Sequence, residues 1–163
     1  MLLVFAAVAA GACASKKTRP APSADKTGHA TEEREASIRG HQFASVADLR
    51  VVSFEYDSDR FSRAGLEILK SNAAAIKRNS EWEVLVEGHC DQRGTVEYNL
   101  ALGQRRAKAV RDYYVLLGIP GRRIATLSYG AELTSCSEAT EGCWAQNRRV
   151  ESKVKTTMAK RTR

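Results

Sequence analysis

The chain has 163 residues, which is enough for one domain of ordinary size with additional segments at its ends. Hydrophobic residues make up 43% of it, a fraction that can supply one buried core. The formal net charge of +7 raises nucleic-acid binding as an alternative function. That alternative is disfavoured because the basic residues are spread along the chain without the aromatic platform on which bases stack.

The N-terminus has the character of an export signal. Residues 1–12, MLLVFAAVAAGA, are apolar but shorter than the ~20 residues of a membrane-spanning helix. The small residues 10–12 directly precede Cys13 and resemble a lipobox, after which a cysteine becomes the lipidated first residue. We therefore expect a signal peptide with its lipidation site at Cys13 over residues 1–13. Ala14 resembles the pattern for export to the outer membrane. The alternative is an apolar N-terminus with an unmodified Cys13.

Residues 14–47 are expected to form a flexible tether. Almost no large apolar side chain occurs over residues 14–36, so this part cannot offset the entropy that ordering would remove. Residues 37–47 contain several apolar side chains and allow two interpretations: the end of the tether, or a strap that packs on the domain. A tether between a lipid anchor and a domain would let the domain reach a polymer layer away from the membrane.

The domain proper is expected over residues 48–155, followed by a basic tail over 156–163. Every second residue over 51–56 is a large apolar one, the pattern of a strand. Ser62 can cap a helix that runs to about Asn79, with apolar residues recurring at helical spacing.

The middle of the chain predicts a strand, a turn and a second long helix in succession. Alternation over residues 82–87 predicts a strand with one well-buried face, which Gly88 ends. Thr95 is a suitable N-cap, and Gly118 ends the helix that follows. The remaining segments predict a strand over 124–129, a helical turn or loop over 143–147, and a last strand over 150–154. Strands alternating with two long helices indicate an α/β domain of two layers.

One stripe of the second helix carries a charged residue, Arg106, between apolar neighbours. The stripe consists of Asn99, Leu102, Arg106, Val110, Tyr113 and Leu117. A guanidinium on a packing face needs a carboxylate or a bound anion, and Asp91 lies in the loop before the helix. One interpretation is a structural ion pair between Asp91 and Arg106. The other is a pair of separated charges that binds a zwitterion, with the carboxylate taking an ammonium and the guanidinium taking a carboxylate.

Four motifs together resemble a known family. The stretch GHCDQRGTVEYNLALGQRRAKAV over residues 88–110 is similar to the signature of the OmpA-like peptidoglycan-binding domain, and is most similar to the versions in peptidoglycan-associated lipoproteins. The segments VVSFEYDSD, SYG and NRRVE resemble the first, third and last strands of that family. The resemblance covers residues 49–154 in the right order, which makes it more specific than a single motif.

This resemblance implies a mixed four-stranded sheet and a pocket for the diaminopimelate-bearing stem peptide of peptidoglycan. In that pocket Asp91 would take the ammonium of the ligand and Arg106 its carboxylate. Asp57, Asn99 and Arg149 match positions that line or support the pocket in the family. The resemblance also implies a periplasmic Tol-system protein as a partner.

The remaining cysteines favour a disulfide over a metal site or a thiol enzyme. Cys136 and Cys143 lack the paired CxxC spacing of zinc sites and are expected to form a disulfide in an exported protein. Cys90 would then be unpaired. His89 and Cys90 are adjacent in sequence and cannot converge on one reacting atom as a base and a nucleophile must.

Calcium is disfavoured at Asp57 and Asp59, because the further oxygen ligands and the glycine of a calcium loop are missing. The sequence thus predicts no metal, no cofactor and no enzymatic activity. It predicts a lipoprotein on the periplasmic face of the outer membrane that binds peptidoglycan and couples the membrane to the wall. The alternatives are an OmpA-like module of another envelope complex and, with less support, a basic nucleic-acid-binding protein.

Overall fold

The computed structural model describes residues 43–156. The predictions for the signal peptide, for Cys13, for the tether up to residue 42 and for the basic tail after residue 156 concern residues outside this range. Within it, no helix is long and apolar enough to cross a membrane.

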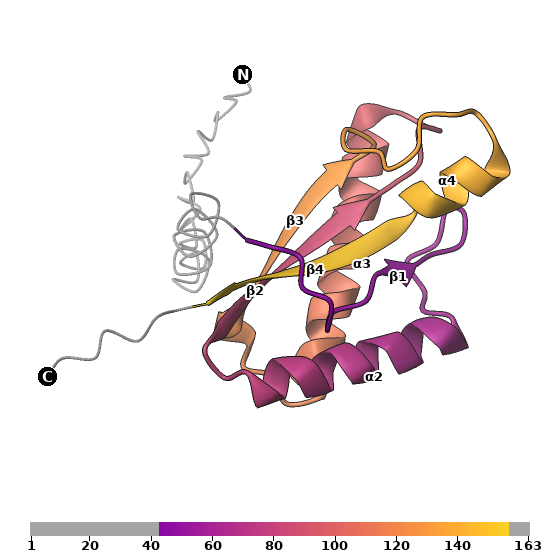
Figure 1. Cartoon of the computed structure of the whole chain (residues 1–163). Helices are drawn as coiled ribbons and strands as arrows, with labels where there is room; N and C mark the ends of the chain where they lie inside the picture. Colours follow the sequence, from indigo (N-terminus) through magenta and orange to yellow (C-terminus); the bar gives the residue numbers. More distant parts are fainter. Residues whose placement is uncertain (1–42, 157–163) are drawn as a thin grey trace, which may run out of the picture.

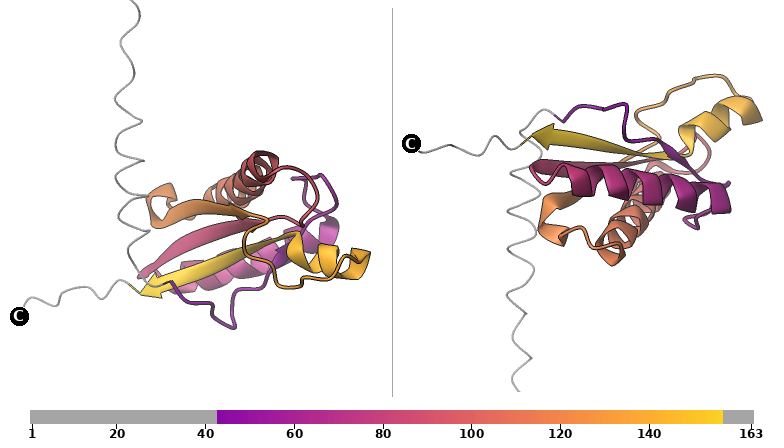
Figure 2. Two further views of the ribbon diagram at one scale, coloured as in Figure 1. Left: turned by 90° about the horizontal axis from the view of Figure 1, so that it is seen from above. Right: turned by 60° about the horizontal axis from the view of Figure 1, so that its bottom comes forward.

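The described chain forms one mixed four-stranded sheet with two long helices packed on it (Figures 1 and 2). Its elements are, in chain order, β1 (Val52–Ser53), α2 (Arg63–Arg78), β2 (Trp82–His89), α3 (Val96–Leu116), η1 (Gly121–Arg123), β3 (Ile124–Gly130), α4 (Glu141–Asn147) and β4 (Arg149–Thr156). The strand order is β1-β4-β2-β3, in which β2 and β3 are parallel and the other neighbours antiparallel. The predicted α/β sandwich with two long helices is confirmed.

Both long helices begin at the predicted caps. The Ser62 hydroxyl accepts a hydrogen bond from the Gly65 amide at 3.0 Å, and α2 starts one residue after Ser62. The Thr95 hydroxyl likewise accepts from the Tyr98 amide at 3.2 Å at the start of α3. At the other end of α3, Gly118 has φ +92°, a conformation that glycine adopts without strain. The local signals of the sequence therefore set these helix boundaries.

The strands differ from the predictions in two ways. The first strand pairs only over β1, after which the chain turns away into a loop where Asp57 has φ +51°. β2 was expected to have one buried face, but it lies between two other strands and both of its faces are covered. Phe43 packs on Leu85 on the face away from the helices. Ala44 forms a bridge with Val154, so residues 43–47 lie on the domain as a strap.

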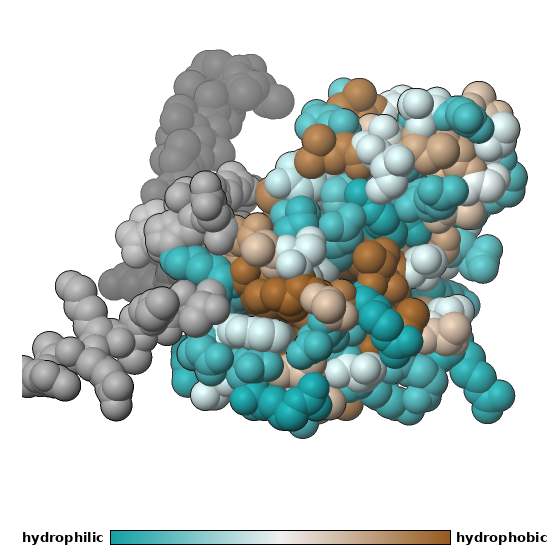
Figure 3. All heavy atoms as spheres, in the orientation of Figure 1, coloured by the Kyte–Doolittle hydropathy of each residue, from teal (hydrophilic) through white to brown (hydrophobic). Residues whose placement is uncertain are grey.

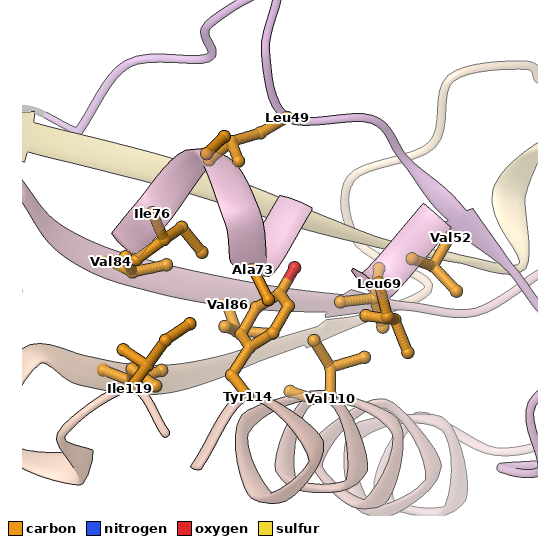
Figure 4. Packing of buried hydrophobic residues seen from close by; sticks show 14 of the residues in the cluster. Leu49, Val52, Leu69, Ala73, Ile76, Val84, Val86, Val110, Tyr114 and Ile119 are labelled. Carbon is orange, nitrogen blue, oxygen red and sulfur yellow. The ribbon is translucent and has the colours of Figure 1, made fainter. Parts of the chain in front are cut away.

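The core lies between the sheet and the two helices (Figure 4). Tyr114 projects from α3 into the middle of this cluster and is fully buried, whereas the predicted Tyr113 is partly exposed and packs at its edge. The Tyr114 hydroxyl lies 3.0 Å from Ser152 Oγ and accepts from Asn72 Nδ2 at 3.3 Å, which satisfies its polar end. The helix stripe is thus shifted by one residue at its C-terminal end. On the outside, hydrophilic residues dominate the visible surface, with smaller hydrophobic areas (Figure 3).

Two glycines bring α3 close to β2. A Cβ on Gly88 would lie 2.0 Å from the carbonyl oxygen of Gly103, and one on Gly103 would lie 2.3 Å from Ser128 Oγ. The first contact is with backbone, so a side chain on Gly88 would push the helix off the sheet, whereas one on Gly103 would first displace the Ser128 hydroxyl. This close approach places the first turns of α3 beside the end of β2, where the polar loop with Asp91 begins.

Candidate ligand-binding site

A pocket of about 500 Å³ opens where the loops after β1 and β2 meet the first turns of α3 and the start of β4. Four of the predicted site residues line it: Asp57, Asp91, Asn99 and Arg106. Arg93 and Arg148, which the sequence did not single out, line it as well. Residues from three separate parts of the chain therefore converge on one cavity.

Asp91 is the buried acid of this pocket, with 4% of its surface exposed. Its Oδ1 accepts from the backbone amide and from Nε of Arg93, both at 3.1 Å. Its Oδ2 accepts from Arg93 Nη2 at 2.7 Å and from Arg148 Nη1 at 3.3 Å. Burial alone would raise the pKa of Asp91, but these hydrogen bonds outweigh burial and hold the pKa below its ordinary value. The carboxylate is thus ionised at neutral pH.

Arg106 is the buried base, with no exposed surface at all. Its Nε donates to the carbonyl of Ser58 at 2.7 Å, its Nη2 to that of Glu55 at 3.0 Å and its Nη1 to that of His89 at 3.0 Å. The guanidinium therefore ties the loop after β1 to the end of β2. Burial lowers the pKa of Arg106 from its ordinary value, yet a guanidinium stays charged in proteins.

The structure excludes one of the two interpretations of this pair of charges, the structural ion pair. Within residues 43–156, the ion pairs of Asp91 are those with Arg93 and Arg148, and none joins it to Arg106. The hydrogen-bond partners of Arg106 are carbonyl oxygens and the Cys90 sulfur, all uncharged acceptors. The structural ion pair is therefore absent. Asp91 and Arg106 both belong to the lining of this pocket, and neither is the ion-pair partner of the other.

Asn99 and Asp57 lie at the rim of the pocket. Asn99 Nδ2 donates to the carbonyls of Arg93 at 2.9 Å and Asp91 at 3.3 Å, which holds the loop between β2 and α3 against the helix. The Tyr98 hydroxyl donates to Asp57 Oδ1 across the opening. This hydrogen bond to the carboxylate raises the pKa of Tyr98.

Arg148, and not the predicted Arg149, lies on the pocket. Arg148 Nη1 reaches Asp91, while its Nε donates to the carbonyl of Phe54 at 3.1 Å and its Nη2 to Glu141 Oε1 at 2.7 Å. Arg149 is the first residue of β4 and points away, with its Nε 2.6 Å from Glu151 Oε1. Neighbouring residues of extended backbone point to opposite sides, so only one of the two arginines can face the cavity. The Asn-Arg-Arg sequence alone did not reveal which.

Arg93 closes one side of the cavity between two aromatic rings. Its guanidinium carbon lies 3.9 Å from the centre of the Tyr56 ring and 4.2 Å from that of Trp144. Trp144 belongs to α4, which the disulfide between Cys136 and Cys143 ties to the preceding loop, as predicted. The disulfide thus helps to position one wall of the site. Cys90 is free and buried, and burial raises the pKa of its thiol.

A second polar cluster lies on the sheet face away from the helices. Potential metal-ligating atoms of Glu87, His89 and Glu151 lie within 4.8 Å of one another. However, Lys153 Nζ lies 2.7 Å from Glu87 Oε2 and Arg149 Nε lies 2.6 Å from Glu151 Oε1, so each carboxylate already has a cation beside it. Burial would raise the pKa of Glu87, but His89 and Lys153 outweigh it and hold that pKa below its ordinary value.

This cluster predicts a loss of stability in acid. The pKa of Glu87 is lower in the folded protein than its ordinary value of 4.5, so the unfolded chain binds more protons as the pH falls below about 5. Asp91 acts in the same direction from its ordinary value of 3.8. We expect the free energy of unfolding in urea to decrease as the pH falls from 5 to 3, with a shallower decrease in Glu87→Gln. The exposed Glu138→Gln is the control, and an unchanged slope in Glu87→Gln would contradict the assignment.

Comparison with known proteins places this site in a family. The model of the OmpA family matches residues 53–148. The chain is 36% identical over 149 residues to a peptidoglycan-associated lipoprotein of Brucella melitensis, a match that covers 91% of the chain and 87% of the relative. It is 43% identical over 110 residues to one of Pseudomonas aeruginosa, covering 68% of the chain and 65% of that relative. The chain therefore belongs to the OmpA family, and the group within it that it resembles is the peptidoglycan-associated lipoproteins.

Solved structures agree with the assignment. The crystal structure of the peptidoglycan-associated lipoprotein from Burkholderia pseudomallei superposes with a TM-score of 0.63 at 38% identity, over 65% of this chain and 90% of that one. The C-terminal domain of Helicobacter pylori MotB superposes with a TM-score of 0.62 at 20% identity, over 67% of this chain and 86% of that one. The similarity to the MotB domain concerns the fold alone.

Proposed function

We propose that this protein binds the stem peptide of peptidoglycan without catalysis and thereby anchors the outer membrane to the cell wall. The observation that carries the proposal is the pair of buried opposite charges on one cavity. Arg106 is buried and has no carboxylate partner in the described part of the chain, which is unfavourable unless an anion completes its surroundings. Asp91 beside it supplies the opposite charge.

The chemistry of the pocket suits the free end of diaminopimelate, which carries an ammonium and a carboxylate on the same carbon. The Asp91 carboxylate would accept hydrogen bonds from the ammonium. Arg106, with Arg148 nearby, would attract the carboxylate into the pocket, where the low local dielectric strengthens both interactions. Asn99 and Asp57 would hold the two loops that shape the opening.

The N-terminal segment would supply the membrane end of the anchor. Lipidation of Cys13 would fix the chain to the periplasmic face of the outer membrane, since several acyl chains bind far more firmly than one. The tether would carry the domain to the wall, and a Tol-system protein would be its periplasmic partner. Relatives named peptidoglycan-associated lipoproteins support this arrangement. Mass spectrometry of the mature N-terminus should find acyl chains on Cys13, and an unmodified Cys13 would exclude the anchor.

The experiment that tests binding is sedimentation with purified sacculi. The protein should pellet with sacculi that contain diaminopimelate, and free tripeptide ending in meso-diaminopimelate should release it. Duplex DNA at physiological salt should retain little of it, because the basic residues are spread along the chain. Retention on DNA that falls steeply with salt, together with no retention on sacculi, would instead favour the nucleic-acid alternative.

A further inference from the structure

Arg93 occupies the place that the ammonium of a ligand would need. Asp91 is the acid of the proposed site, and a carboxylate has about four positions at which it accepts hydrogen bonds. All four are filled: Oδ1 by the amide and Nε of Arg93, and Oδ2 by Nη2 of Arg93 and Nη1 of Arg148. An incoming ammonium can therefore reach Asp91 only by replacing one of these donors.

The Arg93 side chain is the donor that can leave. The Arg93 amide is fixed by the backbone of the loop. Arg148 has a side chain only 6% exposed, and it is held by the Phe54 carbonyl and by Glu141 as well as by Asp91. The Arg93 side chain is 29% exposed, and the hydrogen bonds that it donates within residues 43–156 go to Asp91. Its departure would free two of the four positions on the carboxylate while leaving the backbone contact in place.

Two aromatic rings and two carboxylates surround the space that the Arg93 guanidinium fills. The rings of Tyr56 and Trp144 lie on its guanidinium at 3.9 and 4.2 Å. Asp91 lies 2.7 Å from Nη2, and Glu141 Oε2 lies 3.6 Å from Nη1. Two aromatic rings and two carboxylates around one position attract an ammonium as well as a guanidinium. These four residues, Tyr56, Asp91, Glu141 and Trp144, form what we call the cation box.

We propose that the cation box is the subsite for the ammonium of the stem peptide, and that Arg93 fills it in the ligand-free protein as an exchangeable internal cation. This inference rests on the proposed function for the identity of the ligand. Arg93 then competes with the ligand, so the observed dissociation constant equals the intrinsic one divided by the fraction of molecules in which Arg93 has left.

The first test is the affinity of Arg93→Gln for a soluble muramyl tripeptide ending in meso-diaminopimelate, measured by calorimetry. The variant keeps the backbone amide on Asp91 but lacks the competing cation. It should bind more tightly than the wild type, by about tenfold if Arg93 leaves Asp91 in one molecule in ten. Arg63→Gln removes the same charge from an exposed site at the start of α2 and should bind as the wild type does. Equal or weaker binding by Arg93→Gln would overturn the inference.

The second test does not depend on peptidoglycan. Arg93→Gly should leave the cation box empty, and methylguanidinium should enter it and change the fluorescence of Trp144. The wild type, whose box is filled, should show no such change, and neither should Arg93→Gly with Trp144→Phe. Absence of a response in Arg93→Gly would refute the cation box even if sacculi bind. A response in Arg93→Gly with no wild-type binding to the tripeptide or to sacculi would refute the proposed function and keep the box.

Discussion

Asp91→Asn is expected to abolish sedimentation with sacculi while the domain stays folded. Asparagine has nearly the same shape as aspartate, so the loop between β2 and α3 can keep its backbone contacts. The amide lacks the charge that a ligand ammonium requires, and it leaves Arg148 with Glu141 as its remaining acid. Loss of one member of a buried charge pair weakens binding by about 2–5 kcal/mol, which is about 30-fold or more.

Equilibrium sedimentation over a range of sacculus concentrations would measure this loss, with circular dichroism to verify the fold. Asp48→Asn is the matched control, because Asp48 is exposed outside the pocket and its loss removes the same charge. Wild-type affinity in Asp91→Asn would show that Asp91 does not contact the ligand. Unfolding of Asp91→Asn would show that its main role is to neutralise Arg93 and Arg148.

Arg106→Ala is expected to cause the largest loss of stability among single substitutions at the site. Its guanidinium donates to three carbonyl oxygens, two in the loop after β1 and one at the end of β2, and alanine would leave these acceptors without their donors beside a new cavity. The free energy of unfolding should fall by about 3–5 kcal/mol. The loops that carry Asp57 and Asp91 would also lose their common support, so binding to sacculi should disappear.

Arg106→Lys separates the two roles of this residue. Lysine keeps the positive charge but cannot reach three carbonyls with a planar fork. Urea denaturation should show a smaller loss of stability than in Arg106→Ala, whereas sacculus binding should still be lost. The neighbouring Arg105→Ala, at an exposed position of the same helix, should change neither quantity. Wild-type binding by Arg106→Lys would mean that charge alone, without the geometry of the guanidinium, is sufficient.

The sequence predicted those parts of the fold that depend on short-range signals. The helix caps are local, because the hydroxyls of Ser62 and Thr95 each accept a hydrogen bond from the backbone amide three residues further on. The helix end at Gly118 is local as well, because its backbone conformation favours glycine. Arg106 was recognised because a charge within an apolar stripe is anomalous wherever the helix packs. The sequence pattern did not indicate its hydrogen-bond partners, which are backbone carbonyls of the loop after β1 and of the end of β2.

The predictions were wrong where tertiary contacts decide which side chain is buried or faces the pocket. Tyr114 is buried in place of Tyr113 because a hydrogen bond to Ser152 on β4 is available to it, a partner 38 residues away. Arg148 faces the pocket in place of Arg149 because pairing with β1 and β2 fixes the phase of β4. Arg93 was missed because its neighbours Tyr56 and Trp144 come from the far ends of the domain, and no local spacing connects them.

The proposed site holds an ammonium and a carboxylate of the same ligand in one cavity. Its most direct test compares two soluble muramyl tripeptides by calorimetry, one ending in meso-diaminopimelate and the other in lysine. The two differ only in the carboxylate beside the terminal ammonium. A site built from Asp91 and Arg106 should bind the diaminopimelate peptide at least about tenfold more tightly, since a charge-assisted hydrogen bond to a carboxylate contributes about 1.5–3 kcal/mol. Equal affinities for the two peptides would contradict the account.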